Sequence, residues 1–98
     1  MAYHLVGLLQ IQDPASFERY RAAVGDTLLA YSGRVSSRGE VDTFIWDEIG
    51  CGEFQAVVTI EFPDKAAAQN WAAGPEYQQL LNIRRQALSL TLFGVEQT

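Results

Sequence analysis

The chain has 98 residues, which is the usual size of one domain and leaves no room for a second hydrophobic core. Apolar residues make up 48% of the sequence and charged residues 19%, the balance of a globular protein without a disordered segment. The formal net charge is -5 and the basic residues form no stripe that could neutralise phosphates, which argues against nucleic acid as a partner. We therefore expect one folded domain over residues 1–98.

The single cysteine and the hydropathy of the sequence indicate the cellular compartment of the protein. Cys51 is the single cysteine, so no internal disulfide can form. The N-terminal residues lack the basic start and long apolar stretch of a signal peptide. No apolar run approaches the roughly 20 residues that span a bilayer. These observations predict a soluble cytoplasmic protein that has no membrane partner.

The first half of the chain predicts a strand, a helix and a second extended segment. Residues 3–12 are β-rich and mostly apolar, and the carboxylate of Asp13 can cap a helix that begins at Pro14. Apolar side chains at three- and four-residue steps continue this helix to about residue 31. Gly33 then offers the left-handed backbone that commonly closes a helix. Residues 34–46 are predicted to be extended, with a break at Gly39.

The second half predicts a strand, a helical region and a last strand. These cover residues 54–62, then 65–73 with 76–87, and finally 88–92. Asp64 can cap the helical region, and Gly74 with Pro75 interrupts it. The order β-α-β-β-α-β is that of a ferredoxin-like α+β domain, an antiparallel sheet with two helices on one face.

Strand alternation divides the expected sheet into two unlike faces. The face beneath the helices is apolar throughout, as the alternate residues Leu5, Ile60 and Leu90 illustrate. The other face mixes polar and apolar residues, namely His4, Val6, Leu8, Gln10, Gln55, Val57, Thr59, Glu61, Ser89, Thr91, Phe93 and Val95. Such a face is too apolar for water and too polar for a dry core. We therefore expect a homodimer in which two of these faces meet around a partly wet cavity.

A series of short motifs runs through the chain in a distinctive order. They are the Ala2-Tyr3 start, DPASFERY, the Gly33-Arg34 step, IEFPDKAAAQNW, GPEYQQL and Arg84. Together they resemble the domain of unknown function 1330 family, within the dimeric α+β barrel superfamily, although Ser32 stands where that family usually has a glycine. The resemblance implies a ferredoxin-like protomer in a homodimer with facing sheets. It implies no particular reaction, because superfamily members include cofactor-free monooxygenases, haem-handling enzymes, dehalogenases and isomerases.

One predicted group of polar residues lies on the mixed face. His4 is the only histidine, so any imidazole acid-base step must use it, although a strand histidine can equally be a hydrogen-bonded interface residue. Glu61 shares this face and needs a cation in an otherwise apolar strand, which Arg34 or Arg38 could supply. The group could bind a ligand, but the sequence favours an ion pair that stabilises the subunit or the dimer.

A second candidate pair lies in the last helical region. Tyr77 and Arg84 are seven positions apart, on roughly one side of a helix, and could bind an anion at a pocket mouth. Alternatively, Arg84 packs its stem and bonds a carboxylate. A lone histidine far from a lone cysteine argues against a metal site, and no glycine-rich phosphate loop or dinucleotide motif indicates a cofactor.

Two functions stay open at the level of sequence. The first is a dimeric protein that binds or transforms a small organic molecule in a cavity beside the sheet, lined by His4, Glu61 and an arginine. The second is a non-catalytic module for self-association or protein interaction, whose mixed face is filled by side chains. The sequence does not decide whether the protein is an enzyme, and it identifies no ligand, reaction or pathway.

Overall fold

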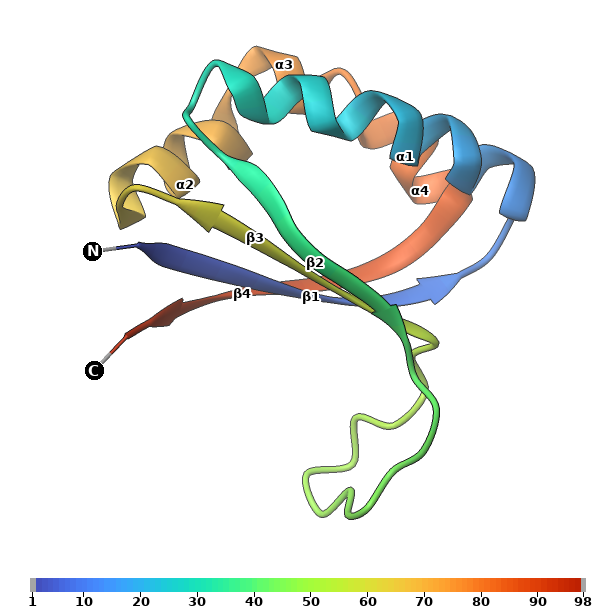
Figure 1. Cartoon of the computed structure of the whole chain (residues 1–98). Coiled ribbons are helices and arrows are strands. Elements are labelled where there is room, and N and C mark those ends of the chain that lie inside the picture. The colour runs from blue at the N-terminus through green and yellow to red at the C-terminus, as the bar shows by residue number, and fades with distance from the viewer. Residues whose placement is uncertain (1, 98) are drawn as a thin grey trace.

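Strands and helices follow each other along the chain in the order expected of a ferredoxin-like domain. A computed structural model describes residues 2–97. Its elements are β1 (Tyr3–Ile11), α1 (Pro14–Leu29), β2 (Arg34–Glu40), β3 (Ala56–Phe62), α2 (Lys65–Ala73), α3 (Pro75–Gln78), α4 (Leu81–Ala87) and β4 (Leu88–Glu96). The strands form one antiparallel sheet in the order β2-β3-β1-β4, and the helices lie on one side of it (Figure 1). None of the described helices is long and apolar enough to cross a membrane.

The core lies between the sheet and these helices. Its buried apolar side chains are Leu5, Leu9, Tyr20, Leu28, Ile60, Phe62, Ala68, Trp71, Tyr77, Ala87 and Leu88. The strand residues among them belong to one alternate set, as expected for a face covered by helices. The prediction of an apolar face beneath the helices is therefore confirmed.

The pairing register fixes what the uncovered side of the sheet carries. His4 lies opposite Glu61 on one neighbouring strand and opposite Val95 on the other. We call this side, which faces away from the helices, the open face. Its residues are His4, Val6, Leu8, Arg34, Ser37, Val57, Thr59, Glu61, Thr91, Phe93 and Val95. The expected mixture of polar and apolar side chains is thus present on one face.

A β-bulge in β2 sends its two arginines to opposite sides of the sheet. Arg34 pairs with Glu61, but the register shifts between Val35 and Ser37, so that Arg38 pairs with Val58. The extra residue reverses the alternation beyond it. Arg34 therefore lies on the open face, whereas Arg38 lies on the side that faces the helices. The prediction that either arginine could accompany Glu61 is wrong for Arg38.

The turn after α1 differs from the expected glycine closure. Ser32, not Gly33, adopts the left-handed backbone, with a φ of 60°. Gly33 is required for space, because a Cβ there would lie 2.5 Å from the ring of Phe62. Since the Phe62 ring is fully buried, it has no free volume into which it could retreat.

The helix boundaries were partly foreseen. Asp64 caps α2 as expected, its carboxylate accepting the backbone N–H of Ala67, but the carboxylate of Asp13 accepts the Ser16 hydroxyl and no backbone N–H of the first turn. The stretch predicted as one helix over residues 76–87 is divided into α3 and α4. The division falls where the N–H of Leu80 bonds three residues back to the carbonyl of Tyr77, a tighter turn than the α-helix makes.

Residues 41–55 form an irregular extension that we call the arm. Extended structure was expected to continue to residue 46, but β2 ends at Glu40. Backbone hydrogen bonds from Val41 to Gln55, and from Gln55 to Leu9, fix the base of the arm beside the sheet. Figure 1 shows the arm projecting beyond the sheet on the side opposite the helices.

Candidate functional site

A cavity of about 760 Å³ opens between α1, the helix-facing side of the sheet and the base of the arm. This volume lies within the range of ordinary small-molecule sites. Its apolar lining is formed by Leu9, Ile11, Phe17, Val24, Leu28, Val35, Phe44, Phe54, Val58, Ile60, Leu88, Leu90 and Leu92. The exposed polar residues that border it are Arg21, Arg38, Glu40, Asp42 and Gln55. The cavity thus joins an apolar interior to a polar rim.

The apolar residues around this space are incompletely covered. Phe17 and Val24 from α1, together with Leu90 from β4, pack against the core yet are only half-buried. Each of them borders the cavity. A ligand with an apolar body could cover these surfaces and gain the free energy of removing them from water.

A hydrogen-bonded tryptophan forms part of the cavity wall. The Trp71 indole Nε1–H donates to Thr27 Oγ1 over 2.9 Å, and the Thr27 hydroxyl donates to the Val24 carbonyl oxygen over 2.6 Å. Trp71 is 1% exposed and Thr27 is 7% exposed. Because the indole N–H has its acceptor in α1, the orientation of this wall is fixed from the helix.

Behind the wall, two tyrosines and an arginine share hydrogen bonds. Tyr20 borders the cavity, and its hydroxyl lies 2.8 Å from that of Tyr77. Arg84 Nη1 donates to the Tyr77 hydroxyl oxygen over 3.0 Å, and its guanidinium lies 5.7 Å from the Tyr77 ring centre. Burial, and next the adjacent Tyr77, raises the pKa of Tyr20 well above its ordinary value. The Tyr20 phenol therefore stays neutral at physiological pH.

This arrangement corrects the expected role of Tyr77 and Arg84. Tyr77 is buried and is not part of the cavity wall, because its side chain packs among core aromatics instead of reaching a mouth. Arg84 bonds the Tyr77 phenol, where the alternative reading expected a carboxylate. The two residues support the cavity wall from behind.

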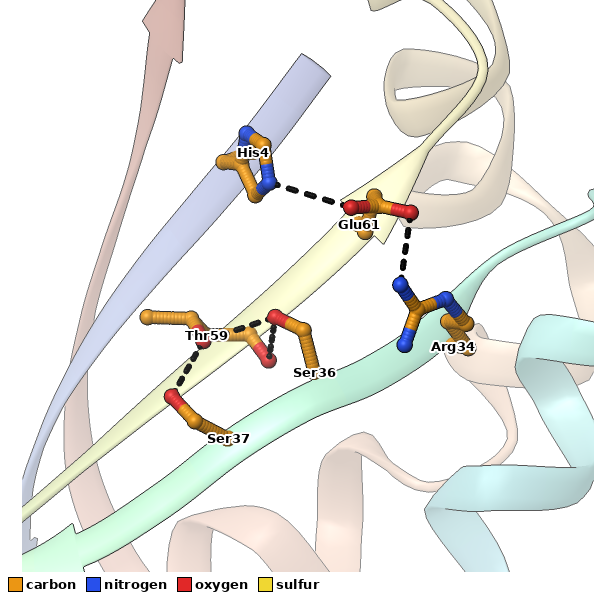
Figure 2. A network of polar contacts seen from close by, with 6 residues as sticks. All are labelled: His4, Arg34, Ser36, Ser37, Thr59 and Glu61. Atoms are coloured by element: carbon orange, nitrogen blue, oxygen red, sulfur yellow. Dashed lines mark hydrogen bonds and ion pairs between the residues drawn. The ribbon is translucent and has the colours of Figure 1, made fainter. Parts of the chain in front are cut away.

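The open face carries a separate ionic cluster near the ends of β1, β2 and β3 (Figure 2). His4 Nε2 lies 3.2 Å from Glu61 Oε2, and Arg34 Nη2 lies 2.9 Å from Glu61 Oε1. The Glu61 side chain is 29% exposed, which confirms that this carboxylate is half-buried beside basic groups. Arg34 and Glu61 also border a shallow hollow at this edge of the sheet. The predicted convergence is confirmed for these three residues.

The cluster and the large cavity lie on opposite sides of the sheet. Of the six residues predicted to bind a ligand, Arg38 borders the cavity, and His4, Arg34 and Glu61 lie on the open face. A cavity lined by His4, Glu61 and an arginine between two facing sheets stays a prediction, because the structure describes a single protomer. The cavity within the protomer opens beneath α1, where the sequence predicts an apolar face of the sheet.

The family can now be assigned. The model of the family described as "Domain of unknown function (DUF1330)" matches residues 1–98. The chain belongs to the DUF1330 family. No curated protein matches its sequence.

Solved structures show the same fold as this DUF1330 chain at low sequence identity. A protein of unknown function from Rhodopseudomonas palustris is 17% identical, with a TM-score of 0.80 over 99% of this chain and 82% of that one. SnoaB, a cofactor-independent oxygenase from Streptomyces nogalater, is 17% identical, with a TM-score of 0.66 over 99% and 95% of the two chains. A dimeric ferredoxin-like protein of unknown function from Jannaschia sp. CCS1 is 14% identical, with a TM-score of 0.64 over 98% and 99%. At these identities the likeness establishes the ferredoxin-like fold.

One signal of the cavity wall was present in the sequence of this DUF1330 chain but did not enter the prediction. Tyr20 and Trp71 are both buried, yet both also border the cavity. Thr27 is a polar residue on the buried side of α1, one position from the apolar stripe. A buried hydroxyl needs a partner, and Trp71 was a candidate donor. Within residues 2–97, no group of three or more His, Cys, Asp or Glu side chains is placed to hold a metal ion.

Proposed function

We propose that this DUF1330 protein is a homodimer that binds, and thereby can act on, a small organic molecule in the cavity beneath α1. The observation that carries the proposal is the cavity itself, about 760 Å³ of space with apolar walls in a chain of 98 residues. Protein interiors are normally packed without voids of this kind. A binding site is the usual reason for a small domain to keep one.

The walls favour a ligand with an apolar, flat body and a polar end. Phe17, Tyr20 and Trp71 present aromatic surfaces, while Arg38 and other polar side chains stand at the rim. The raised pKa of Tyr20 makes its phenol a neutral hydrogen-bonding group, so it is unsuited to act as a general base. SnoaB, which has a similar fold, is a cofactor-independent oxygenase. This supports a ligand site that needs no bound cofactor, while the substrate of that enzyme says nothing about the ligand of this chain.

The homodimer is proposed from the open face. Phe93 is 46% exposed and Val95 is 39% exposed, and both lie among half-buried apolar residues of the neighbouring strand. Two copies that bring these faces together would remove that apolar surface from water. The dimeric neighbour from Jannaschia supports such an assembly. In this arrangement, the cluster around Glu61 is an ion pair of the interface.

Titration with 1-naphthol tests the cavity, because this probe has an aromatic body and one hydroxyl. We expect saturable binding that quenches the fluorescence of Trp71 on the cavity wall. Val24→Phe would fill part of the space and weaken binding at least tenfold. Ala22→Phe is the matched control, since Ala22 is exposed on the same helix and does not border the cavity; it should leave affinity within about twofold, a difference of under 1 kcal/mol.

Two outcomes contradict the ligand proposal. Equal affinity of the Val24→Phe variant and the native protein would place the probe elsewhere. A folded native protein that binds neither 1-naphthol nor benzoate at millimolar concentration would favour the alternative, a module whose work is self-association alone. A self-association module would use the open face as its interface and would bind no ligand in the cavity.

A further inference from the structure

The arm presents its largest apolar side chains to solvent. Ile45 is 74% exposed, Trp46 is 81% exposed and Ile49 is 94% exposed. Single exposed apolar residues are ordinary on a protein surface, but three large ones within five positions of one arm are a concentration that a contact with another molecule would explain.

The arm holds these side chains in a fixed arrangement. The rings of Phe44 and Phe54 pack edge to face with their centres 5.6 Å apart, which ties the two limbs of the arm together. Asp47 Oδ1 accepts the backbone N–H groups of Gly50 and Cys51 at the tip, each over 3.1 Å. Because the arm is ordered by its own contacts, it loses little conformational entropy when a partner binds it.

The position of the arm limits what can cover it. In Figure 1 the arm projects past the sheet on the side opposite the helices, which is the side of the open face. A body that covers the open face therefore approaches on the side where the arm projects. The arm and the open face thus lie on the same side of the molecule, so a second copy that packs on the open face comes close to the arm.

The charge of the arm distinguishes between possible occupants. It contains Asp42, Asp47, Glu48 and Glu53 and no lysine or arginine. An acidic segment is repelled by the anionic surface of cytoplasmic membranes and by nucleic acid. A second copy of the chain instead offers the exposed apolar residues of its open face, Phe93 and Val95.

The exposed area suits a contribution to a dimer. Ile45, Trp46 and Ile49 together expose on the order of 500 Å², against roughly 800 Å² that each partner buries in a standard interface. Two-fold symmetry would use both arms, so a dimer would gain this contact twice. The two arms would therefore supply a large share of a standard interface.

We infer that the arm packs against a second copy of this chain, with Ile45, Trp46 and Ile49 in contact with the partner subunit. This inference rests on the homodimer of the proposed function and adds a second contact to the facing sheets. Phe44 and Phe54 of the arm also border the cavity. The contact between the arm and the partner subunit therefore fixes the rim of the ligand site. The site is then complete only in the dimer.

The experiment compares dimer dissociation by sedimentation equilibrium in the native protein and in two variants. Ile45→Glu combined with Ile49→Glu should raise the dissociation constant at least a hundredfold, because each dimer loses four apolar contacts and gains four charges at them. Leu29→Glu is the matched control, since Leu29 is also 74% exposed but lies on α1, away from the arm. It should change the constant by less than twofold. Circular dichroism checks that every variant is folded.

Native fluorescence gives an independent readout if the double variant does not fold. Trp46 and Trp71 are the only tryptophans, and Trp71 is buried within one subunit. Dilution through the dissociation constant should therefore shift the emission to longer wavelength as Trp46 enters water. Trp46→Ala should abolish this shift and weaken the dimer at least tenfold.

The results distinguish refutation of the arm contact from refutation of the homodimer. If the native protein and the folded double variant form dimers with the same dissociation constant, the arm contact is overturned. The sheet-to-sheet dimer would still hold, and Phe93→Glu should then dissociate it. A native protein that stays monomeric at millimolar concentration overturns both. A blue shift of Trp46 emission on adding phosphatidylcholine vesicles, without any dilution-dependent shift in their absence, would assign the arm to a membrane and overturn the inference.

Discussion

Replacing Thr27 with valine tests whether the hydrogen bond between α1 and α2 fixes the cavity wall. Valine has nearly the shape of threonine but cannot accept a hydrogen bond. The substitution would leave the Trp71 indole N–H without its acceptor at a site where the side chain is 1% exposed. It would also remove the bond from the Thr27 hydroxyl to the Val24 carbonyl.

The magnitude follows from these two losses. An unsatisfied buried donor destabilises a protein by about 1–3 kcal/mol, whereas a lost hydrogen bond whose acceptor keeps its helical partner costs about 0.5–1.5 kcal/mol. Because the buried donor dominates, we expect Thr27→Val to lower the free energy of unfolding by about 2–3 kcal/mol. For a domain of this size, that corresponds to a fall in Tm of roughly 8–24 °C.

Urea denaturation and thermal melting measure the effect, and Thr27→Ser provides the control. Serine keeps the hydroxyl and loses one methyl group, worth about 1 kcal/mol. A Trp71→Phe variant, alone and with Thr27→Val, completes a double-mutant cycle that isolates the pairwise term. If Thr27→Val is no more destabilising than Thr27→Ser, or if the two substitutions are simply additive, the hydrogen bond does not stabilise the wall and the reasoning is refuted.

Three further substitutions test other parts of the structure. Gly33→Ala should destabilise by about 1–3 kcal/mol in urea denaturation, because the new methyl group must displace the buried Phe62 ring; an unchanged midpoint would contradict the packing described. Glu61→Gln should cost less than about 1 kcal/mol in the dissociated protomer, where its ion pairs are partly exposed, and should leave 1-naphthol affinity unchanged, whereas weaker binding would connect the open face to the cavity. A hydrogen bond from the Tyr31 hydroxyl lowers the pKa of Glu76, and this contribution to stability is present above the unfolded-state pKa and is lost as the pH falls. Tyr31→Phe should therefore raise the pKa of Glu76 in an NMR titration, and the stability difference from the native protein should shrink on acidification; an unmoved carboxyl titration would disprove the contact.

Strand alternation predicted the faces of the sheet correctly where the strands are regular. The two-residue period placed His4 and Glu61 on one face, and the register confirms it. It also separated the apolar side that packs beneath the helices. These features were predictable because they depend on local backbone geometry and on whether moving each side chain from water into the core is favourable.

Features that depend on long-range geometry were not predictable. The face beneath the helices has the same composition whether α1 packs closely on it or stands away from it, so the sequence could not reveal the cavity. The left-handed residue was assigned to Gly33 because glycine pays no steric penalty there, yet Ser32 adopts it and Gly33 serves the packing of Phe62. The arm was interpreted in part as strand, since Phe44, Ile45 and Trp46 have high β-propensity. Its course is set by contacts at its base.

The extra residue in β2 has a consequence for the comparison of related chains. Ser36 and Ser37 both bond Thr59, so the bulge places two residues opposite one (Figure 2). A relative that lacked one of these serines would have a regular ladder, and its equivalent of Arg38 would still face the helices. In an alignment, a one-residue gap at this point would therefore leave the cavity wall intact, while an ungapped alignment of the same two sequences would assign the arginine to the wrong side of the sheet. Residues of β2 that border the cavity are best matched by counting back from the base of the arm, and those of the ionic cluster by counting forward from Gly33.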